Sequence, residues 1–567
     1  MENFFEKMLI NNIRKPARYV GNEWNIIRKN NAFLKVALCF PDIYEVGMSH
    51  LGLKILYSIG NLNSDISCER VFAPWPDMEE LMRKEGVKLY SLETYTPVKD
   101  FDIVGFSYQY EMLATNILNM LELSGLNIRS DRRLEKDPVI IAGGSAVYNP
   151  CPISRFIDAF VIGDGEIVFE KILKLFYQLK KQGFSKKAAL EELSKVSGVY
   201  VPCLHNTDTV AIVAQKVDSL DDVFFPTSVV VPNICIVHDR IAIEIMRGCT
   251  GGCRFCQAGF VNRPRRERSV EKIIQLAEDL YHTTGYEEIS LLSLSSGCYS
   301  SSYGLLQKMI EKFKTLGVGI SFPSLCIDKT VQKFPSLLKE IYKTGLTFAP
   351  EVGTDRMRRV INKDINEQVL LDCVASAYKQ GWGKIKLYFM IGLPTETDED
   401  VEKIAEISLK VSREGKKIAR QSTNVTISVS TFVPKSHTPF QWEKMCSEEQ
   451  IYHKIDIIQK KLVGSRIKTD FHNPKTSILE ALIARGNEKI ADVIEWAWKN
   501  GARFDAWNEH FKQDIWDIAL KKNGIDVERC LCEKNLDEKL PWDFIDIGIK
   551  KEHLMDINRS IVRTGNY

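Results

Sequence analysis

The stretch IEIMRGCTGGCRFCQAG, Ile243 to Gly259, decides how the rest of the chain is interpreted. Three cysteines, Cys249, Cys253 and Cys256, fall within eight residues with the spacing C-x3-C-x2-C. A structural zinc site takes four ligands, whereas a disulfide takes two. An iron–sulfur cubane also takes four thiolates, so three of them leave one iron open to bind something else.

The residues between the cysteines suit a loop that wraps a cluster. Gly251 and Gly252 free the backbone, and Phe255 can keep water away from the last thiolate. Soft thiolates select zinc, copper(I) or iron–sulfur clusters. From spacing alone, two alternatives stay open: a zinc site completed by a remote ligand, and a coincidental group of buried thiols.

The loop follows the first of six apolar runs that alternate with helical segments. The six candidate strands are 241–246, 288–294, 318–324, 345–350, 384–392 and 425–433. In the helix that starts after Ser269, that serine can cap the first turn, and Ile273, Ala277 and Leu280 share a face. Six such units predict a partial (βα)6 barrel or a second open sheet. Active sites of these architectures lie at the carboxyl ends of the strands, where the three cysteines are expected.

The first third of the chain carries the same alternation. Short apolar runs at 33–39, 102–107, 139–143 and 158–163 are separated by helical stretches, which predicts a parallel, doubly wound, Rossmann-like sheet. We therefore divide the chain into an α/β domain over 1–170, a connector with small strands over 171–235, a barrel over 236–445 and a mostly helical cap over 446–567. The chain after about residue 440 carries six of the nine tryptophans, typical of a packed core or a lid.

Composition sets the broad class. The 567 residues are 44% hydrophobic and 26% charged with a net charge of +2, so no global field favours nucleic acid or a membrane surface. The N-terminus lacks a secretory pattern, and no run of about 18 apolar residues is present. Fourteen cysteines in such a chain fit a reducing cytoplasm. Cys530 and Cys532 form a C-x-C pair that is too sparse for a metal site by itself.

RGCTGGCRFCQAG resembles the cluster loop of the radical S-adenosylmethionine (radical SAM) enzymes, and the resemblance extends over roughly 241–440. In that superfamily the three cysteines hold a [4Fe–4S] cluster whose open iron is chelated by the methionyl group of S-adenosylmethionine (SAM). The resemblance implies reductive cleavage of SAM to a 5′-deoxyadenosyl radical. It also implies an electron donor such as flavodoxin or ferredoxin.

Further SAM contacts are carried over by resemblance. Ser295, Ser296 and Gly297 stand where the superfamily has a Gly-Gly-Glu-like segment that meets the SAM amino group, and here no carboxylate is present. Glu351 resembles a carboxylate that meets the SAM ribose; the alternative is a surface glutamate paired with Arg356 or Arg358. IGLPTET resembles the glycine-rich turn near the adenine, which would use Gly392.

Two features near this region leave alternatives open. The turn NRPRRERS, with Arg263, Arg265, Arg266 and Arg268, could grip an anionic substrate or guide a reducing partner, or be a solvated basic turn. Cys298 in SLSSGCYSS is a weak catalytic candidate, as a hydrogen-atom donor or a covalent attachment point. The alternative that we favour is a small buried residue.

The N-terminal domain resembles the cobalamin-binding fold. That fold's motif is D-x-H-x-x-G, then a serine, then Gly-Gly; here the matching positions are Asp42, Tyr44, Gly47, Ser107, Gly143 and Gly144. Tyr44 replaces the cobalt-ligating histidine. The alternative is a domain that binds no cofactor and only shapes the substrate cleft. A second cluster, as in the methylthiotransferases, is not favoured because Cys39, Cys68, Cys151 and Cys203 are far apart in sequence.

Together these stretches resemble a radical SAM family with a cobalamin-binding-like N-terminal domain and no assigned reaction. The sequence therefore predicts an enzyme that cleaves SAM and modifies an unknown substrate. Among the reactions that this resemblance implies, cobalamin-dependent methylation is the one we expect first. The alternatives are a radical ring closure or rearrangement, and, from another class, a non-catalytic metal- or cobalamin-binding regulatory module. Nothing in the sequence indicates a membrane partner or a clear nucleic-acid partner.

Overall fold

The N-terminal sheet is parallel and covered on both faces. The computed structural model describes residues 1–183, 185–322, 345–363, 365–418 and 423–565. The strands lie in the order β2-β1-β3-β4-β5-β6, and only β6 is antiparallel. Their bounds are β1 Leu34–Phe40, β2 Ile66–Phe72, β3 Ile103–Ser107, β4 Val139–Gly143, β5 Ala159–Val161 and β6 Val199–Tyr200.

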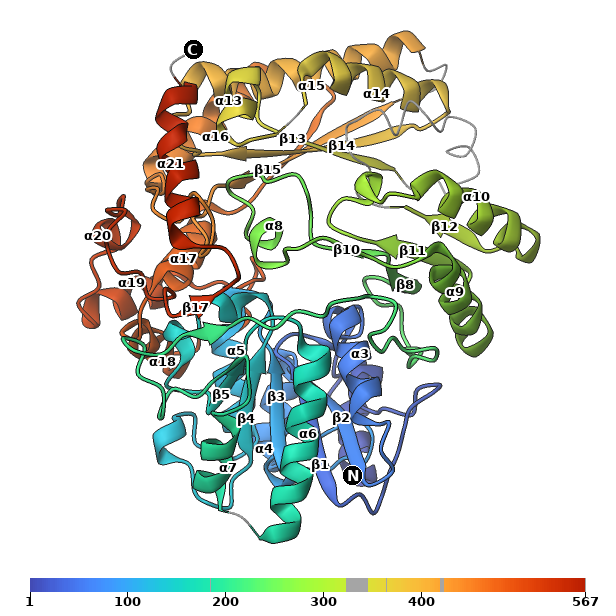
Figure 1. Cartoon of the computed structure of the whole chain (residues 1–567), viewed down its shortest axis with the longest axis vertical. Helices are drawn as coiled ribbons and strands as arrows, with labels where there is room; N and C mark the ends of the chain where they lie inside the picture. Colours follow the sequence, from blue (N-terminus) through green and yellow to red (C-terminus); the bar gives the residue numbers. More distant parts are fainter. Residues whose placement is uncertain (184, 323–344, 364, 419–422, 566–567) are drawn as a thin grey trace.

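Helices pack on both faces of this sheet (Figure 1). Helices α3 (Leu51–Gly60) and α6 (Gly165–Gln182) contact each other on one face, and α4 (Pro76–Glu85) and α5 (Ala114–Leu123) bury their apolar sides in the core on the other. The chain reverses its winding direction between β1 and β3. Ligands of open α/β sheets bind at such a switch point, beyond the carboxyl ends of the strands.

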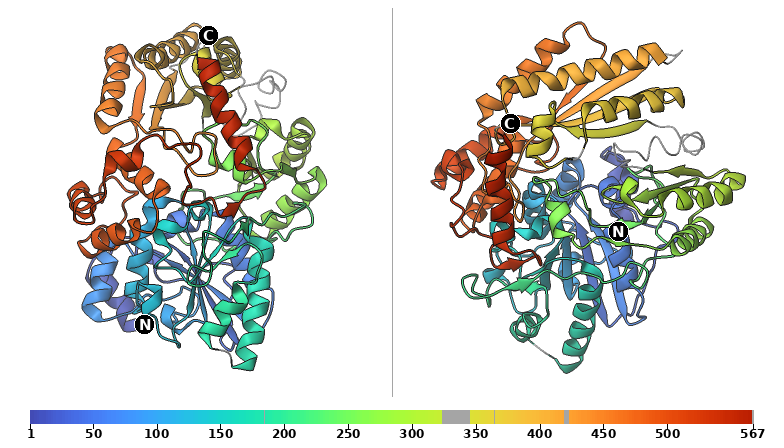
Figure 2. Two further views of the ribbon diagram at one scale, coloured as in Figure 1. Left: turned by 60° about the vertical axis from the view of Figure 1, so that its left-hand side comes forward. Right: turned by 45° about the horizontal axis from the view of Figure 1, so that its top comes forward.

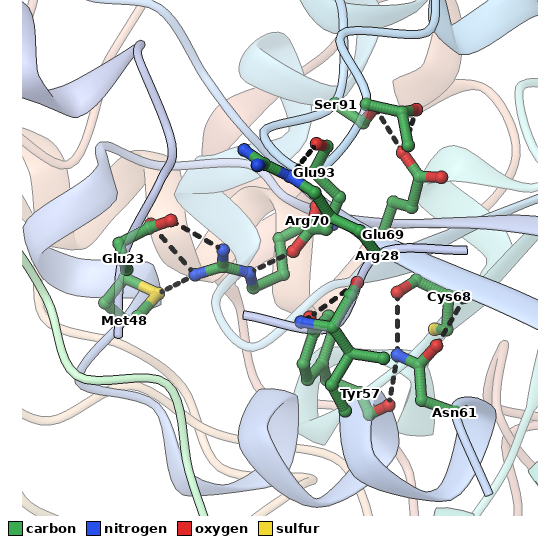
Figure 3. A network of polar contacts seen from close by, with 12 residues as sticks. Glu23, Arg28, Met48, Tyr57, Asn61, Cys68, Glu69, Arg70, Ser91 and Glu93 are labelled. Carbon is green, nitrogen blue, oxygen red and sulfur yellow. Dashed lines mark hydrogen bonds and ion pairs between the residues drawn. The ribbon is translucent and has the colours of Figure 1, made fainter. Parts of the chain in front are cut away.

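The sequence analysis missed strand β2 because two charged residues interrupt its apolar run. All seven residues of ISCERVF are buried in the structure. Arg70 is 2% exposed and forms ion pairs with Glu93 (Nε to Oε1, 2.6 Å) and Glu23 (Nη2 to Oε2, 3.1 Å). Glu69 accepts hydrogen bonds from the Ser91 and Thr94 hydroxyls. Figure 3 shows how these partners converge on β2, so the charges are satisfied inside the domain.

The central region holds all six predicted strands in chain order, in two parallel sheets. One sheet has the order β12-β11-β8 and the other β13-β14-β15-β16. The bounds are β8 Ile241–Glu244, β11 Glu288–Leu292, β12 Gly319–Ser321, β13 Leu346–Glu351, β14 Lys384–Ile391, β15 Asn424–Thr431 and β16 Lys468–Phe471. The end of the third predicted strand, 323–324, lies outside the described residues.

The helices of this region cover the outside of the two sheets (Figure 1). They are α9 Val270–Thr284, α10 Ser302–Phe313, α13 Asp355–Val360, α14 Glu367–Lys379 and α15 Asp398–Ile418. The short helix α8 (Gln257–Val261) lies instead in the middle of the molecule. Ser269 caps α9 as predicted, because its side chain accepts a hydrogen bond from the Lys272 amide.

The C-terminal third is mostly helical and packs against the N-terminal domain. It contains α16 Glu448–Leu462, α17 Pro474–Arg485, α18 Ile490–Lys499, α19 Gln513–Lys522, α20 Val527–Leu531 and α21 Lys551–Gly565. Helix α18 contacts α5, and the long helix α21 runs beside α13 (Figures 1 and 2). The Trp498 and Trp507 indoles donate hydrogen bonds to Asn119 and Asp42 of the N-terminal domain. The predicted α/β class with a helical C-terminal region is confirmed.

Two short pairings complete the frame. In the connector, α7 (Lys186–Leu193) leads to β7 (Ile212–Val213), which pairs in parallel with β17 (Ile545–Asp546) near the other end of the chain. Strand β9 (Met246–Arg247) pairs antiparallel with β10 (Arg266–Glu267). None of the helices in the described part of the chain has the length and apolar character needed to span a bilayer.

We predict that Arg70→Met destabilises the protein strongly, because it leaves Glu23 and Glu93 buried without a counter-charge. The expected loss in the free energy of unfolding is about 3–5 kcal/mol. Arg83→Met is the matched control: Arg83 also pairs with two glutamates but is 40% exposed, so a loss of about 1 kcal/mol or less is expected. Urea unfolding of both variants measures the difference, and equal losses would contradict the role given to burial.

Asp42→Asn tests the contact between the N-terminal domain and the C-terminal third. Burial raises the pKa of Asp42 to about 6, although the Ile43 amide and the Trp507 indole lower it by hydrogen bonding. A carboxyl whose pKa is raised on folding costs stability once it ionises. The variant should therefore be more stable than the wild type by about 2 kcal/mol at pH 8, with the gain fading as the pH falls from 6 to 4. The control is Asp131→Asn at an exposed position, which should change the free energy of chemical unfolding by less than about 0.5 kcal/mol.

Candidate functional site: the cluster loop and the cavity beside it

The three cysteines lie in a short loop between β9 and α8. Cys256 is the residue before α8, and its amide donates to the Cys253 carbonyl (3.0 Å). The Gly251 amide donates a hydrogen bond to Cys249 Sγ (3.3 Å). A Cβ atom placed on Gly251 would lie 3.5 Å from Cys249 Sγ and 3.8 Å from Cys253 Sγ. The loop therefore brings these thiols to one side of a bare glycine.

The thiols influence one another electrostatically. Burial raises the pKa of Cys253 to about 11; Lys363 lowers it, and the Cys256, Glu351 and Cys249 charges raise it. Burial likewise raises the pKa of Cys256. Within the described ranges, no three His, Cys, Asp or Glu side chains gather closely enough to hold a single metal ion.

Arg254 fixes the loop from behind. Its side chain is buried, and its guanidinium donates to the Val360 carbonyl (2.6 Å) at the end of α13 and to Ser560 Oγ (3.2 Å) on α21. Its amide donates to the Ile361 carbonyl (3.0 Å). The neighbouring Phe255 packs on an apolar group that contains Val360, Ile361, Leu393, Phe440 and Ile561. Elements from three parts of the chain thus hold the loop in place.

Glu351 faces the cluster loop at the end of β13. The register of β13 against β14 shifts between Phe348 and Glu351. Glu351 has a backbone φ of 67°, a value that residues other than glycine rarely adopt. Burial raises the pKa of this carboxyl, and Lys363, whose Nζ lies 3.2 Å away, lowers it. The alternative, in which Glu351 pairs with Arg356 or Arg358, is wrong, because Arg356 pairs with Asp400 and Arg358 with Asp355.

The remaining predicted SAM contacts lie on two strand ends. Ser295 and Ser296 are buried in the turn after β11, where Ser293 and Ser296 share a hydrogen bond of 2.9 Å. Gly297 follows in the same turn, and the Cys298 sulfur is 3.2 Å from Ser295 Oγ. Cys298 is half-buried and packs against the core, and both alternatives for this thiol stay predictions. Gly392 ends β14 with a φ of 83° and donates its amide to Glu396 (2.7 Å).

The basic turn after α8 is largely structural. Arg266 is buried and pairs with Asp164 (2.6 Å), and Arg268 is 1% exposed and lies over the Phe225 ring. The expectation of a solvated or anion-gripping turn is therefore wrong for these two residues. Arg263 stacks on Phe260, and Arg265 donates to the Cys298 carbonyl.

A cavity of about 530 Å³ connects the N-terminal sheet to the cluster loop. On one side it is lined by Ser107, Gly143 and Gly144 at the carboxyl ends of β3 and β4. On the other side it is lined by Gly248 and Gln257, which flank the three cysteines in sequence. The switch point of the first sheet and the cluster loop therefore open onto one space.

The cavity continues into an apolar slot between the sheet and its helices. Leu38, Ile141 and Val161 line the sheet side, and Ile55 on α3 and Phe169 on α6 line the other. Gly105 and Gly143 also face the slot. A Cβ at Gly143 would meet nothing closer than 3.7 Å, so the protein itself does not require glycine there. The missing side chain leaves room for a ligand.

The first half of the predicted cobalamin motif lies outside the cavity. Tyr44 is 2% exposed and its hydroxyl donates to Glu23 (3.1 Å). Asp42 accepts from Trp507, and a Cβ on Gly47 would lie 2.3 Å from the Phe72 ring. These three residues pack the domain. The structure brings together only Ser107, Gly143 and Gly144 of that motif.

Sequence reasoning missed the ion cluster in the cavity wall. Arg247, two residues before Cys249, pairs with Glu166 (Nη2 to Oε1, 2.6 Å), Asp164 (Nη1 to Oδ1, 3.0 Å) and Glu244 (Nη2 to Oε2, 2.8 Å). Burial lowers the pKa of Arg247, but the three carboxylates raise it by more. The sequence signal was VIGDGE, whose acidic residues open α6 at the end of β5.

The described cysteines of the N-terminal domain do not form a second cluster site. Cys39 on β1 and Cys151 belong to the core on one face of the sheet, whereas Cys68 on β2 belongs to the core on the other face. Cys203 is exposed. The sheet itself separates these thiols.

Comparison with known proteins relates the chain to several relatives. The uncharacterised protein MJ0966 of Methanocaldococcus jannaschii is 29% identical over 467 residues, which cover 82% of this chain and 91% of that protein. The tRNA-2-methylthio-N(6)-dimethylallyladenosine synthase of Petrotoga mobilis is 24% identical over 201 residues, which cover 34% and 44%.

Two solved structures are similar in outline. The radical S-adenosylmethionine methyltransferase TsrM of Kitasatospora setae, with cobalamin and a [4Fe–4S] cluster bound, has a TM-score of 0.49 at 13% identity and covers 71% of this chain and 72% of that chain. The cobalamin-dependent S-adenosylmethionine radical enzyme OxsB has a TM-score of 0.48 at 12% identity and covers 94% and 79%.

Two family models match the chain itself. Residues 52–202 match the N-terminal family of radical SAM proteins, and residues 243–407 match the radical SAM superfamily. The second match contains the three-cysteine loop, Glu351 and Gly392, and the two together cover more than half of the sequence. The chain therefore belongs to the radical SAM superfamily and is an enzyme of that superfamily.

Proposed function

We propose that the protein reductively cleaves SAM beside a bound cobalamin and methylates a substrate that is not identified. The observation that carries this proposal is the shared cavity. It reaches Ser107, Gly143 and Gly144 on one side and the cluster loop on the other, so a ligand held by the first sheet would face the chemistry of the second.

The residues of the cluster loop fit a [4Fe–4S] cluster. The loop carries three thiols and two adjacent glycines. Three thiolates leave one iron of a cubane without a protein ligand. When bound, such a cluster supplies one electron to SAM. The chain would hold it through Cys249, Cys253 and Cys256, while Arg254 and Phe255 keep the loop rigid and shield it from water.

Glu351 supports the position of SAM. Its carboxylate is buried at the carboxyl end of β13, close enough to the loop to influence the Cys253 and Cys256 thiols, and its backbone is strained. Buried acceptors at such a place suit ribose hydroxyls, and Lys363, whose Nζ lies 3.2 Å from the carboxylate, partly offsets the rise in the pKa of Glu351 that burial causes. Ser295, Gly297 and Gly392 would contribute from the neighbouring strand ends.

The chemistry of the cavity lining suits parts of a cobalamin. This cofactor combines a polar corrin rim with a flat, apolar benzimidazole on a nucleotide tail. The slot between the sheet and helices α3 and α6 is apolar, and its glycines leave space. When bound, cobalamin would supply a methyl carrier; Ser107 and the Gly143–Gly144 amides would contact it at the strand ends. The electron donor would be a flavodoxin or a ferredoxin.

Cysteine variants test the cluster. Replacing Cys249, Cys253 or Cys256 by alanine should remove the broad absorbance near about 400 nm after anaerobic reconstitution, and with it the formation of 5′-deoxyadenosine from SAM and dithionite. Cys298→Ala is the matched control, since this thiol lies outside the loop, and it should keep both. Stoichiometric zinc in place of iron and sulfide would contradict the cluster assignment.

A glycine variant tests cobalamin binding. Gly143→Leu should fill the slot and abolish retention of cobalamin after desalting, while the cluster and SAM cleavage remain. Gly383→Leu is the matched control because Gly383 is exposed and a Cβ there meets nothing within 4 Å. If the wild type retains no cobalamin yet cleaves SAM, the N-terminal domain only shapes the cleft, and a radical ring closure or rearrangement replaces methylation.

A further inference from the structure

His50 is a cavity residue that the motif comparison did not single out. It stands at the N-cap of α3, six residues after the position where the sequence would place a cobalt-ligating histidine. Its ring lines the cavity that Ser107 and Gly143 line from the strand ends, and it leans on the Phe40 ring at 5.3 Å. Among the described residues that line the cavity, His50 is therefore the one that carries an imidazole.

The cap fixes the tautomer of this ring. The Leu53 amide donates a hydrogen bond to Nδ1 of His50 at 3.1 Å. A backbone amide can only donate, so Nδ1 must carry a lone pair, and the single ring proton of the neutral imidazole lies on Nε2. Burial, followed by the charge of Lys54, lowers the pKa of His50 to about 4, so the ring stays neutral.

Nothing in the described residues accepts the Nε2 proton. No hydrogen bond to Nε2 occurs among these residues, and the atom is not one of the buried polar atoms that lack a partner. The Nε2–H group is therefore accessible, and the accessible space beside this ring is the cavity. A ligand there meets a hydrogen-bond donor.

We propose that His50 donates a hydrogen bond from Nε2 to an acceptor of the ligand in this cavity and does not ligate its metal. The inference rests on the proposed function, in which that ligand is cobalamin, whose corrin rim carries amide carbonyl groups. Ligation would need the Nε2 lone pair. The proton would then move to Nδ1 and face the Leu53 N–H, so that two donors oppose each other and α3 loses its cap.

His50→Ser separates these roles because serine keeps an oxygen that can cap α3 but removes the imidazole. The dissociation constant of hydroxocobalamin, measured by absorbance titration, should rise about fivefold to tenfold for the loss of one hydrogen bond. His205→Ser is the matched control. His205 also accepts a backbone hydrogen bond through Nδ1 (from Val201, 3.0 Å) but does not line the cavity, so binding should be unchanged.

Electron paramagnetic resonance of bound cob(II)alamin tests the second half of the proposal. Protein labelled uniformly with ¹⁵N should give the same spectrum as unlabelled protein, because no protein nitrogen binds cobalt. A nitrogen splitting that changes with the label in the wild type and disappears in His50→Ser would overturn the proposal. Equal affinity of wild type and His50→Ser would overturn it as well.

The same titration separates failure of the inference from failure of the proposed function. If the wild type binds no cobalamin, the cofactor assignment fails, and the His50 proposal fails with it. If the wild type binds cobalamin and the variant binds equally well, only the role of His50 is wrong. Far-ultraviolet circular dichroism of both serine variants shows whether either replacement unfolds the domain.

Discussion

The ion pairs of the Arg247 guanidinium join the N-terminal domain to the central region that carries the cluster loop. Arg247 pairs with two carboxylates of the N-terminal domain, Asp164 and Glu166, and with Glu244 at the end of the preceding strand β8. An arginine side chain that is 14% exposed and has three carboxylate partners is costly to displace, because, within the described ranges, its two glutamate partners would lose their counter-charge and Asp164 would keep only Arg266. Cys249 follows two residues later. The ion pairs of Arg247 with Asp164 and Glu166, which follow β5, therefore help to position the cluster loop relative to the first sheet.

This arrangement follows from a general property of parallel sheets. Their carboxyl ends carry the loops that bind ligands, and here two such ends face each other across one cavity. The first sheet offers Ser107 and Gly143. The cysteine loop follows β8 of the sheet β12-β11-β8, and Glu351 lies at the end of β13 in the other central sheet. The C-terminal third closes the frame, since α21 reaches the loop through Ser560 and the tryptophans of 498–507 reach the first domain.

The elements and loops that are marked by patterns of apolar residues and glycines could be predicted from the sequence. The contacts between charged residues that are distant in sequence could not. The six central strands and most of the first sheet follow from predominantly apolar runs. Strand β2 was missed because Glu69 and Arg70 look like a solvated turn until Glu23 and Glu93 are placed beside them. The cysteine loop was singled out by its spacing, its place after an apolar run and its resemblance to the radical SAM cluster loop. The Arg247 cluster and His50 were missed because their roles depend on residues about 80 positions away or on a ring tautomer fixed by a backbone amide. The cobalamin motif misled for Asp42, Tyr44 and Gly47, which pack the domain.

The central claim is that one cavity serves both the first sheet and the cluster loop. A crystal structure of the anaerobically reconstituted protein with cobalamin and SAM tests it most directly. The account predicts corrin density at the ends of β3 and β4, with the nucleotide tail between the sheet and helices α3 and α6, and SAM density between the three cysteines and Glu351. Cobalamin bound elsewhere, or a slot that stays empty while both ligands are bound, would contradict it.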